Sequence, residues 1–202
     1  MYDPDAYTIA AYAAESPEHT FKVGVFVLAT INQHFEHVPG ILANFKRYGM
    51  ECKNFTRSQK LSIKQLAAKQ QALFDAIAKF RTMKRPEHAA LRYMVEYRGF
   101  GFVKASFLLQ LLIPDIRLGC LDRHNITMYG LSARAFSGIP TSTYGLTSKI
   151  NTYIKVCENL GGTSTLWNNW CLYLATLRPA AFPTGEAVSK LHVTCILGDD
   201  HA

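Results

Sequence analysis

Apolar residues recur along most of the chain at the three- and four-residue spacing that is typical of amphipathic helices. In residues 21–37 they fall at Phe21, Val25, Leu28, Ile31 and Phe35. Beyond a helical arm at 1–19, the same pattern predicts helices at 41–48, 58–85, 86–98, 105–113, 122–135, 149–160 and 163–174. We therefore predict an all-α protein of about eight helices with short connections.

Some segments do not follow this periodicity. Residues 137–148 are rich in Gly, Ser, Thr and Pro, which predicts a loop. Residues 179–202 show little periodicity, and their apolar run at 191–197 is either a strand or a packed extension. The chain has no internal repeat and no linker. This predicts a single domain over residues 1–202, with its core at about 20–178 and a C-terminal extension.

The composition is that of a globular protein with a basic surplus. The chain has 202 residues, of which 49% are hydrophobic and 18% charged, and its formal net charge is +7. Such a charge favours a polyanionic partner. The first residues lack the features of a secretory signal, and no apolar run is long enough to span a bilayer. We therefore expect a cytoplasmic protein with no membrane partner.

Cysteine and histidine show no pattern that predicts a metal site or a disulfide framework. The five cysteines are odd in number and widely spaced, and the seven histidines lack the His-x-x-x-His spacing of zinc sites. We expect reduced cysteines that pack as small core residues, and no metal or cofactor.

Positive charge is concentrated in residues 46–85. This stretch holds eleven of the chain's 22 lysines and arginines, against only Glu51 and Asp75. Its apolar residues mark one face of a long helix, and lysines such as Lys60 and Lys64 mark the other. Two interpretations stay open. The lysines form either a solvated helix face or a nucleic-acid footprint, in which they bind phosphates and release counterions.

A Gly-x-Gly turn at residues 99–101 joins two predicted helices. The glycines allow φ > 0 and a close backbone approach, and the first amides of the next helix have no intrahelical partner. Such a turn binds an anion such as a DNA phosphate. The alternative is an ordinary helix connection. Asp122 begins a later helix, where it acts as an N-cap, as a catalytic carboxylate, or as both.

Taken in order, these motifs resemble those of the helix-hairpin-helix DNA glycosylase superfamily, which includes endonuclease III. Gly99-Phe100-Gly101 is similar to its hairpin, with Ala105 four residues further on, and Asp122-Arg123-His124 is similar to its Asp-x-His motif. Asn32-Gln33 ends a segment like the one that fills the gap left by a flipped base. Residues 167–170 resemble the closing helix of the family domain. The resemblance covers about residues 20–178.

The resemblance implies a compact helical fold with a cleft between two lobes. It implies that Gly99, Phe100 and Gly101 hold the DNA backbone, and it allows a monovalent cation at this hairpin. Asn32 and Gln33 are then DNA-binding residues beside an extruded base. Extrusion costs a few kcal/mol. Asp122 is the implied catalytic residue, which stabilises developing positive charge or activates the nucleophile.

Three departures from the family pattern change what this resemblance predicts. Bifunctional glycosylases carry a nucleophilic lysine at the position of Val103, and Lys104 lies about 100° further around the helix. We therefore expect Lys104 to point elsewhere and predict no Schiff-base lyase activity. The four-cysteine iron–sulfur signature is absent, and Arg123, which is suited to phosphate binding, stands inside the Asp-x-His motif.

Some phage members of this superfamily are amino acid:DNA transferases, also described as α-glutamyl or putrescinyl thymine pyrophosphorylases. A resemblance of this chain to these transferases implies that an amine displaces phosphate from a phosphorylated 5-hydroxymethyluracil in double-stranded DNA. Asp122 or His124 then serves as the base, while Arg123 and Lys104 stabilise the leaving phosphate. We favour this function, with an amino acid or a polyamine as donor, in a host-cell cytoplasm if the chain is phage-encoded. The alternatives are a monofunctional DNA glycosylase and a non-catalytic DNA-binding protein.

Overall fold

In a computed structural model of the protein, residues 4–31 and 33–198 are described, and every regular element among them is helical. The α-helices are α1 Pro4–Glu15, α2 Pro17–Ala29, α3 Val38–Tyr48, α4 Arg57–Ala68, α5 Gln70–Arg81, α6 Glu87–Met94, α7 Phe102–Leu112, α8 Arg123–Met128, α9 Ala133–Phe136, α10 Thr143–Asn159, α11 Gly162–Leu177 and α12 Gly185–Leu197. Two short 3-10 helices are η1 Phe35–His37 and η2 Gly49–Glu51. The all-α prediction is confirmed, with twelve α-helices in the described part of the chain instead of about eight.

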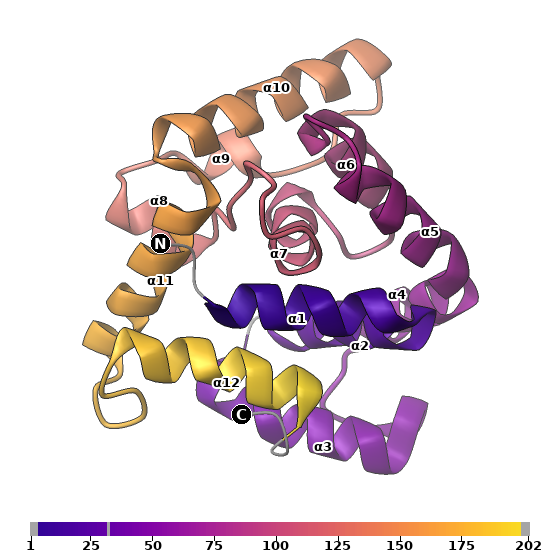
Figure 1. Ribbon diagram of the computed structural model, residues 1–202, viewed down its shortest axis with the longest axis vertical. Helices are drawn as coiled ribbons and strands as arrows, with labels where there is room; N and C mark the ends of the chain where they lie inside the picture. Colours follow the sequence, from indigo (N-terminus) through magenta and orange to yellow (C-terminus); the bar gives the residue numbers. More distant parts are fainter. Residues whose placement is uncertain (1–3, 32, 199–202) are drawn as a thin grey trace.

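Helix α7 occupies the centre of the molecule, where Figure 1 shows it end-on with the other helices around it. Nine of its eleven residues are buried, and the two that are not are Val103 and Lys104. A helix with an apolar surface nearly all round must lie inside a protein. It packs against α1, α2 and α6, and one contiguous set of buried hydrophobic residues extends from α1 to α12.

Helix α2 begins earlier and ends earlier than the predicted segment at 21–37. Its N-cap is Ser16, whose hydroxyl accepts from the His19 backbone N–H at 3.1 Å. Thr20 is buried within the helix and donates to the Ala13 carbonyl. The helix ends at Ala29, and the Thr30 N–H is shared between the carbonyl oxygens of Phe26 and Val27.

The single helix predicted at 58–85 is two helices, α4 and α5, which meet at Lys69. Lys69 has a φ of −117° and a ψ of 17°, outside the helical range. Both helices pack against α2, with Leu66 and Leu73 buried on either side of the break. Neither Gly nor Pro marks this break, so its cause is the packing on α2.

The C-terminal apolar run belongs to a helix, α12, and the alternative of a strand was wrong. This helix packs against α1, α2 and α11, and it places Val188, His192 and Val193 in the core. The predicted N-terminal arm is helical, and α1 contacts α2, α7 and α12. Among the described helices, none is long and apolar enough to pass through a membrane.

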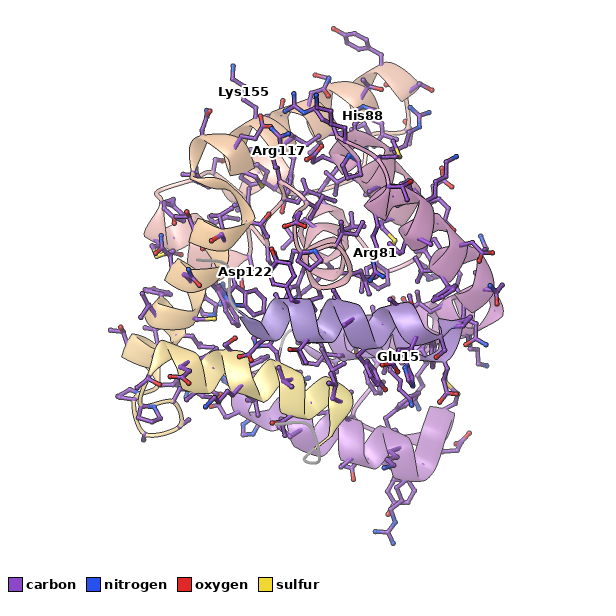
Figure 2. The ribbon with its side chains drawn as sticks, in the orientation of Figure 1. Glu15, Arg81, His88, Arg117, Asp122 and Lys155 are labelled. Carbon is purple, nitrogen blue, oxygen red and sulfur yellow. The ribbon has the colours of Figure 1, made fainter. Side chains whose placement is uncertain are left out.

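Arg81 fastens three helices together on one side of α7. From α5 its guanidinium donates to the carbonyl oxygens of Ala10 in α1, at 2.8 Å, and Leu112 in α7, at 2.7 Å. Desolvation lowers the pKa of this guanidinium. Figure 2 shows Arg81 and Asp122 on opposite sides of α7. Asp122 therefore lies away from the hydrogen bonds that Arg81 makes between the helices.

Candidate functional site

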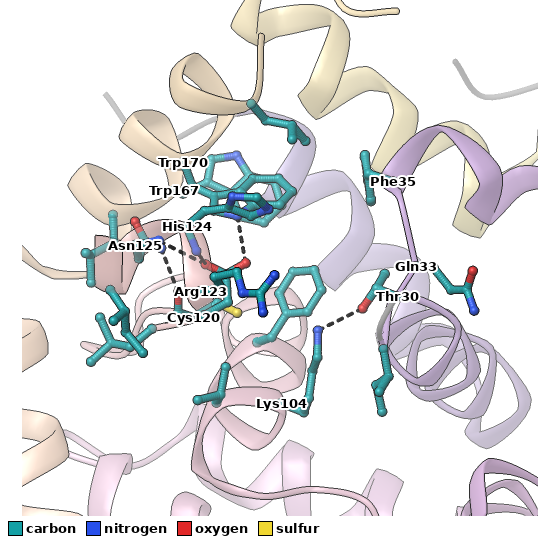
Figure 3. Close-up of a pocket in the computed structure, with 18 of the residues that line it drawn as sticks. Thr30, Gln33, Phe35, Lys104, Cys120, Arg123, His124, Asn125, Trp167 and Trp170 are labelled. Carbon is teal, nitrogen blue, oxygen red and sulfur yellow. Dashed lines mark hydrogen bonds between the residues drawn. The ribbon is translucent and has the colours of Figure 1, made fainter. Parts of the chain in front are cut away.

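A cavity of about 910 Å³ has Asp122 in its wall, and we call it the Asp122 cavity. Four segments enclose it: the turn after α2, one face of α7, the residues around the start of α8, and α11 with Arg178. Figure 3 shows the side chains that these segments contribute. Its volume lies at the upper end of the range of about 300–1,000 Å³ that is typical of small-molecule sites.

Asp122 is the N-cap of α8. Its Oδ1 accepts from the backbone N–H groups of His124 and Asn125, both at 3.0 Å. Its Oδ2 accepts from the indole Nε1–H of Trp170 at 2.9 Å, the bond drawn from that ring in Figure 3. A carboxylate has about four lone-pair sites. The cap and the indole therefore fix the orientation of the carboxylate and leave one site on Oδ2 for a ligand.

Three buried side chains hold the segment that leads into Asp122. The Tyr153 hydroxyl donates to the Gly119 carbonyl at 2.8 Å and accepts from the Leu121 N–H at 3.2 Å. The Ser106 hydroxyl also donates to the Gly119 carbonyl, at 2.9 Å. The side-chain oxygen of Gln110 accepts from the Cys120 backbone N–H at 3.0 Å. Burial raises the pKa of Tyr153 well above its ordinary value, so its hydroxyl stays protonated.

Replacing Tyr153 with Phe is expected to lower the free energy of unfolding by about 1–3 kcal/mol, because the Leu121 N–H loses its partner in a buried place. Urea unfolding followed by circular dichroism measures the loss. Tyr144→Phe is the matched control, since Tyr144 is 86% exposed and its change should be neutral. Equal stability of the two variants would refute the structural role of the Tyr153 hydroxyl.

Lys104 lies in the wall of the Asp122 cavity, so the expectation that it points elsewhere was wrong. Its Nζ donates to the Thr30 hydroxyl at 3.0 Å and lies 5.4 Å from the centre of the Phe107 ring. Val103 lines the same cavity. The cavity borders the first turns of α7 on more than one side. A lysine that lies about 100° around the helix from Val103 can therefore still reach the cavity with its long side chain.

The other residues of the Asp-x-His motif also line the cavity. Arg123 is exposed, and Figure 3 shows its guanidinium and the Lys104 ammonium directed to the same region. His124 is half-buried, with its ring 5.8 Å from that of Tyr173. Asn125 is buried and donates to the Cys120 carbonyl at 2.6 Å. The motif therefore contributes both the carboxylate and a cation to one wall.

Aromatic side chains that the sequence analysis did not assign to the site form another part of this wall. Trp167 and Trp170 lie with ring centres 6.3 Å apart, and the Phe35 ring meets Trp170 edge-on at 5.6 Å. Their signal in the sequence is the Trp-x-x-Trp spacing, which places both indoles on one helix face. Trp170 is half-buried and can stack on a planar ligand, whereas Trp167 and Phe35 are buried and support it from behind.

The Gly-x-Gly turn lies outside the Asp122 cavity. Gly99 has a φ of +82°, but Gly101 has a φ of −70° and is the N-cap of α7, so the expected positive φ holds for Gly99 alone. The Phe100 ring is buried, which leaves its backbone for any DNA contact. The turn lines a separate hollow that also includes Leu61 and Gln65 of α4.

The predicted DNA-binding residues fall into two groups. Lys60 and Lys64 lie on α4, a helix that contacts the turn through Gln65, whose side-chain oxygen accepts from the Arg98 N–H at 2.7 Å. Gln33 is exposed at the edge of the Asp122 cavity, and in Figure 3 it lies across the cavity from His124 and Asn125. Asn32 lies outside the described residues.

Cys120 is the thiol in this cavity wall. Desolvation raises its pKa, so the thiol is protonated at neutral pH and is a poor nucleophile. Across residues 4–31 and 33–198, no group of three or more His, Cys, Asp or Glu side chains is arranged to hold a metal ion.

Comparison with protein-family models, curated proteins and solved structures gives no significant match for this chain. The assignment of its function therefore depends on the residues of the site itself.

Proposed function

We propose that the protein modifies DNA by taking an extruded base into the Asp122 cavity and replacing a phosphate on that base with an amine. The observation that carries the proposal is the content of one cavity, where Asp122 occurs with the cations Lys104 and Arg123 and with two indole rings. Aromatic rings stack on bases, and cations stabilise a departing phosphate. A carboxylate accepts the proton of an attacking amine.

The reaction requires a base phosphorylated on the side-chain oxygen of 5-hydroxymethyluracil. The donor's ammonium first loses one proton to solvent. Its nitrogen then forms a bond to the exocyclic methylene as the carbon–oxygen bond breaks, and phosphate leaves with the electron pair. Asp122 or His124 takes the second proton from the new secondary ammonium, while Lys104 and Arg123 offset the charge of the phosphate.

We further propose a helix-hairpin-helix glycosylase-like fold, in which α6 and α7 flank the hairpin at residues 99–101. Two observations support it: the positive φ of Gly99, and the position of α4 beside the turn. In this arrangement the hairpin and the lysines of α4 bind backbone phosphates, while the base enters the Asp122 cavity.

Replacing Lys60, Lys64 and Lys69 with Gln is expected to weaken DNA binding and flatten its dependence on salt. Each lost phosphate contact reduces the slope of log K against log salt by about 0.9. Fluorescence anisotropy between 50 and 200 mM salt measures the slope. Lys155→Gln on α10 is the control. An unchanged slope in the triple variant would assign α4 to a solvated face.

The decisive experiment supplies duplex DNA containing 5-phosphomethyluracil together with amino acids and polyamines. Digestion to nucleosides and mass spectrometry then identify the product. A mass gain that matches an added amine and a lost phosphate supports the transferase. Salt-dependent binding with no product under any condition would instead identify a DNA-binding protein without catalysis.

A DNA glycosylase is the second candidate, and the position of Lys104 in the Asp122 cavity favours it. An amine there can attack C1′ of a target nucleotide as the bond from C1′ to the base breaks, and opening of the sugar ring then gives a Schiff base. Borohydride traps such an intermediate as a covalent protein–DNA complex. Released free base, with a trapped complex that disappears in Lys104→Gln, would establish this function in place of the transferase.

A further inference from the structure

A second group of charged residues lies in the wall of the Asp122 cavity. Arg178, at the end of α11, and His34 and Glu36, in the turn after α2, all line it. The Arg178 Nη2 donates to His34 Nδ1 at 2.6 Å, and its Nη1 lies 3.4 Å from Glu36 Oε1. Arg178 and Glu36 keep 43% and 25% of their side chains exposed, so a ligand in the cavity can reach both.

The contacts fix which groups these side chains offer to a ligand. Arginine has only donors, so His34 Nδ1 accepts and the neutral ring carries its proton on Nε2. The hydrogen bond to His34 occupies one of the five guanidinium N–H groups, and Nη1 forms an ion pair with Glu36, so guanidinium N–H groups are left for an anion. Glu36 offers carboxylate oxygens to a cation.

The turn that carries His34 and Glu36 is anchored by the residue between them. The Phe35 ring is buried, with its centre 5.6 Å from Trp170 and 4.5 Å from His192. His34 and Glu36 are therefore held in place without being buried. A fixed carboxylate beside a fixed guanidinium suits a ligand that carries an ammonium and a carboxylate on one carbon.

We propose that Glu36, Arg178 and His34 form a subsite for the ammonium and carboxylate groups of an α-amino acid. Glu36 accepts from the ammonium, the free N–H groups of Arg178 bind the carboxylate, and His34 holds the guanidinium in place. The volume of about 910 Å³ leaves space for this ligand beside a base at Lys104 and Asp122. The role of the bound amino acid as amine donor rests on the proposed function.

The test measures binding without DNA and without turnover. Ligand-observed saturation-transfer NMR screens the twenty standard amino acids one at a time at 5 mM. The strongest binder is compared with its decarboxylated and deaminated analogues, which should bind at least tenfold more weakly. Arg178→Gln and Glu36→Gln should each weaken binding at least tenfold, while Arg134→Gln on α9 is the control. Circular dichroism confirms that each variant is folded.

Several results would overturn the subsite. They are no amino acid bound at 5 mM, affinity unchanged in Arg178→Gln and Glu36→Gln, or an amine without a carboxylate that binds equally well. In those cases the three residues only fasten α11 to the turn after α2. Amino-acid binding without any DNA product would instead keep the subsite and refute the proposed function. A transferase product made only with polyamines would refute the subsite and keep the proposed function.

Discussion

Replacing Asp122 with Asn is expected to reduce product formation by roughly 10²–10⁴-fold, the usual contribution of a general base, while DNA affinity is retained. The amide oxygen still accepts from the N–H groups of His124 and Asn125, so the cap of α8 is kept. What is lost is the charge, the free lone pair and the hydrogen bond from the Trp170 indole, because an amide nitrogen cannot accept. Nucleoside mass spectrometry measures the product, and fluorescence anisotropy measures DNA affinity.

Two further variants separate chemistry from structure at this residue. Asp122→Ser keeps an N-cap side chain and should be as inactive as Asp122→Asn. Trp170→Phe removes only the indole bond to Oδ2, and should keep most of the activity. Full activity in Asp122→Asn would refute the role of Asp122 as the general base of the transferase.

Replacing Gly99 with Ala is expected to destabilise the protein by about 2–3 kcal/mol. A left-handed φ of +82° costs an alanine about 1–2 kcal/mol. Its Cβ would also lie 2.6 Å from the Ser62 hydroxyl, which cannot rotate away without losing its bond to the Ser58 carbonyl. For a chain of this size, the melting temperature should fall by roughly 4–12 °C in a thermal scan.

Gly101→Ala is the matched comparison. Gly101 has a φ of −70°, and its added Cβ meets no atom within 4 Å. The free energy of unfolding of Gly101→Ala should therefore stay within about 1 kcal/mol of that of the parent protein. If the turn binds a DNA backbone, the new methyl group in this open space should lower DNA affinity. Equal melting temperatures for the two variants would contradict the close packing of Gly99 on Ser62.

The two variants therefore report on different properties of one turn. Gly99→Ala tests how α4 and the turn are packed together, and Gly101→Ala tests what binds on the outside. A Gly101→Ala protein that is stable and binds DNA normally would remove the turn from the proposed DNA interface while leaving the Asp122 cavity unaffected.

Local patterns in the sequence predicted the features that depend on near neighbours. The spacing of apolar residues gives the all-helical class, and Asp122 is the N-cap of a helix as its position suggested. Patterns failed where the cause is remote. No residue near Lys69 marks the break between α4 and α5, because packing on α2 sets it. The C-terminal run is helical because α1, α2 and α11 cover it.

The same distinction applies to the site. By itself, the sequence determined that Asp122, Arg123 and His124 occur together, because they are consecutive residues of one motif. Only the tertiary structure decided that Lys104, the two indoles and Arg178 share a cavity with them. These side chains come from separate segments of the chain, and no local spacing records the packing around α7 that joins them. An offset of about 100° describes where a side chain points on one helix. The wall of the Asp122 cavity is built from several segments, so that offset does not decide which side chains reach it.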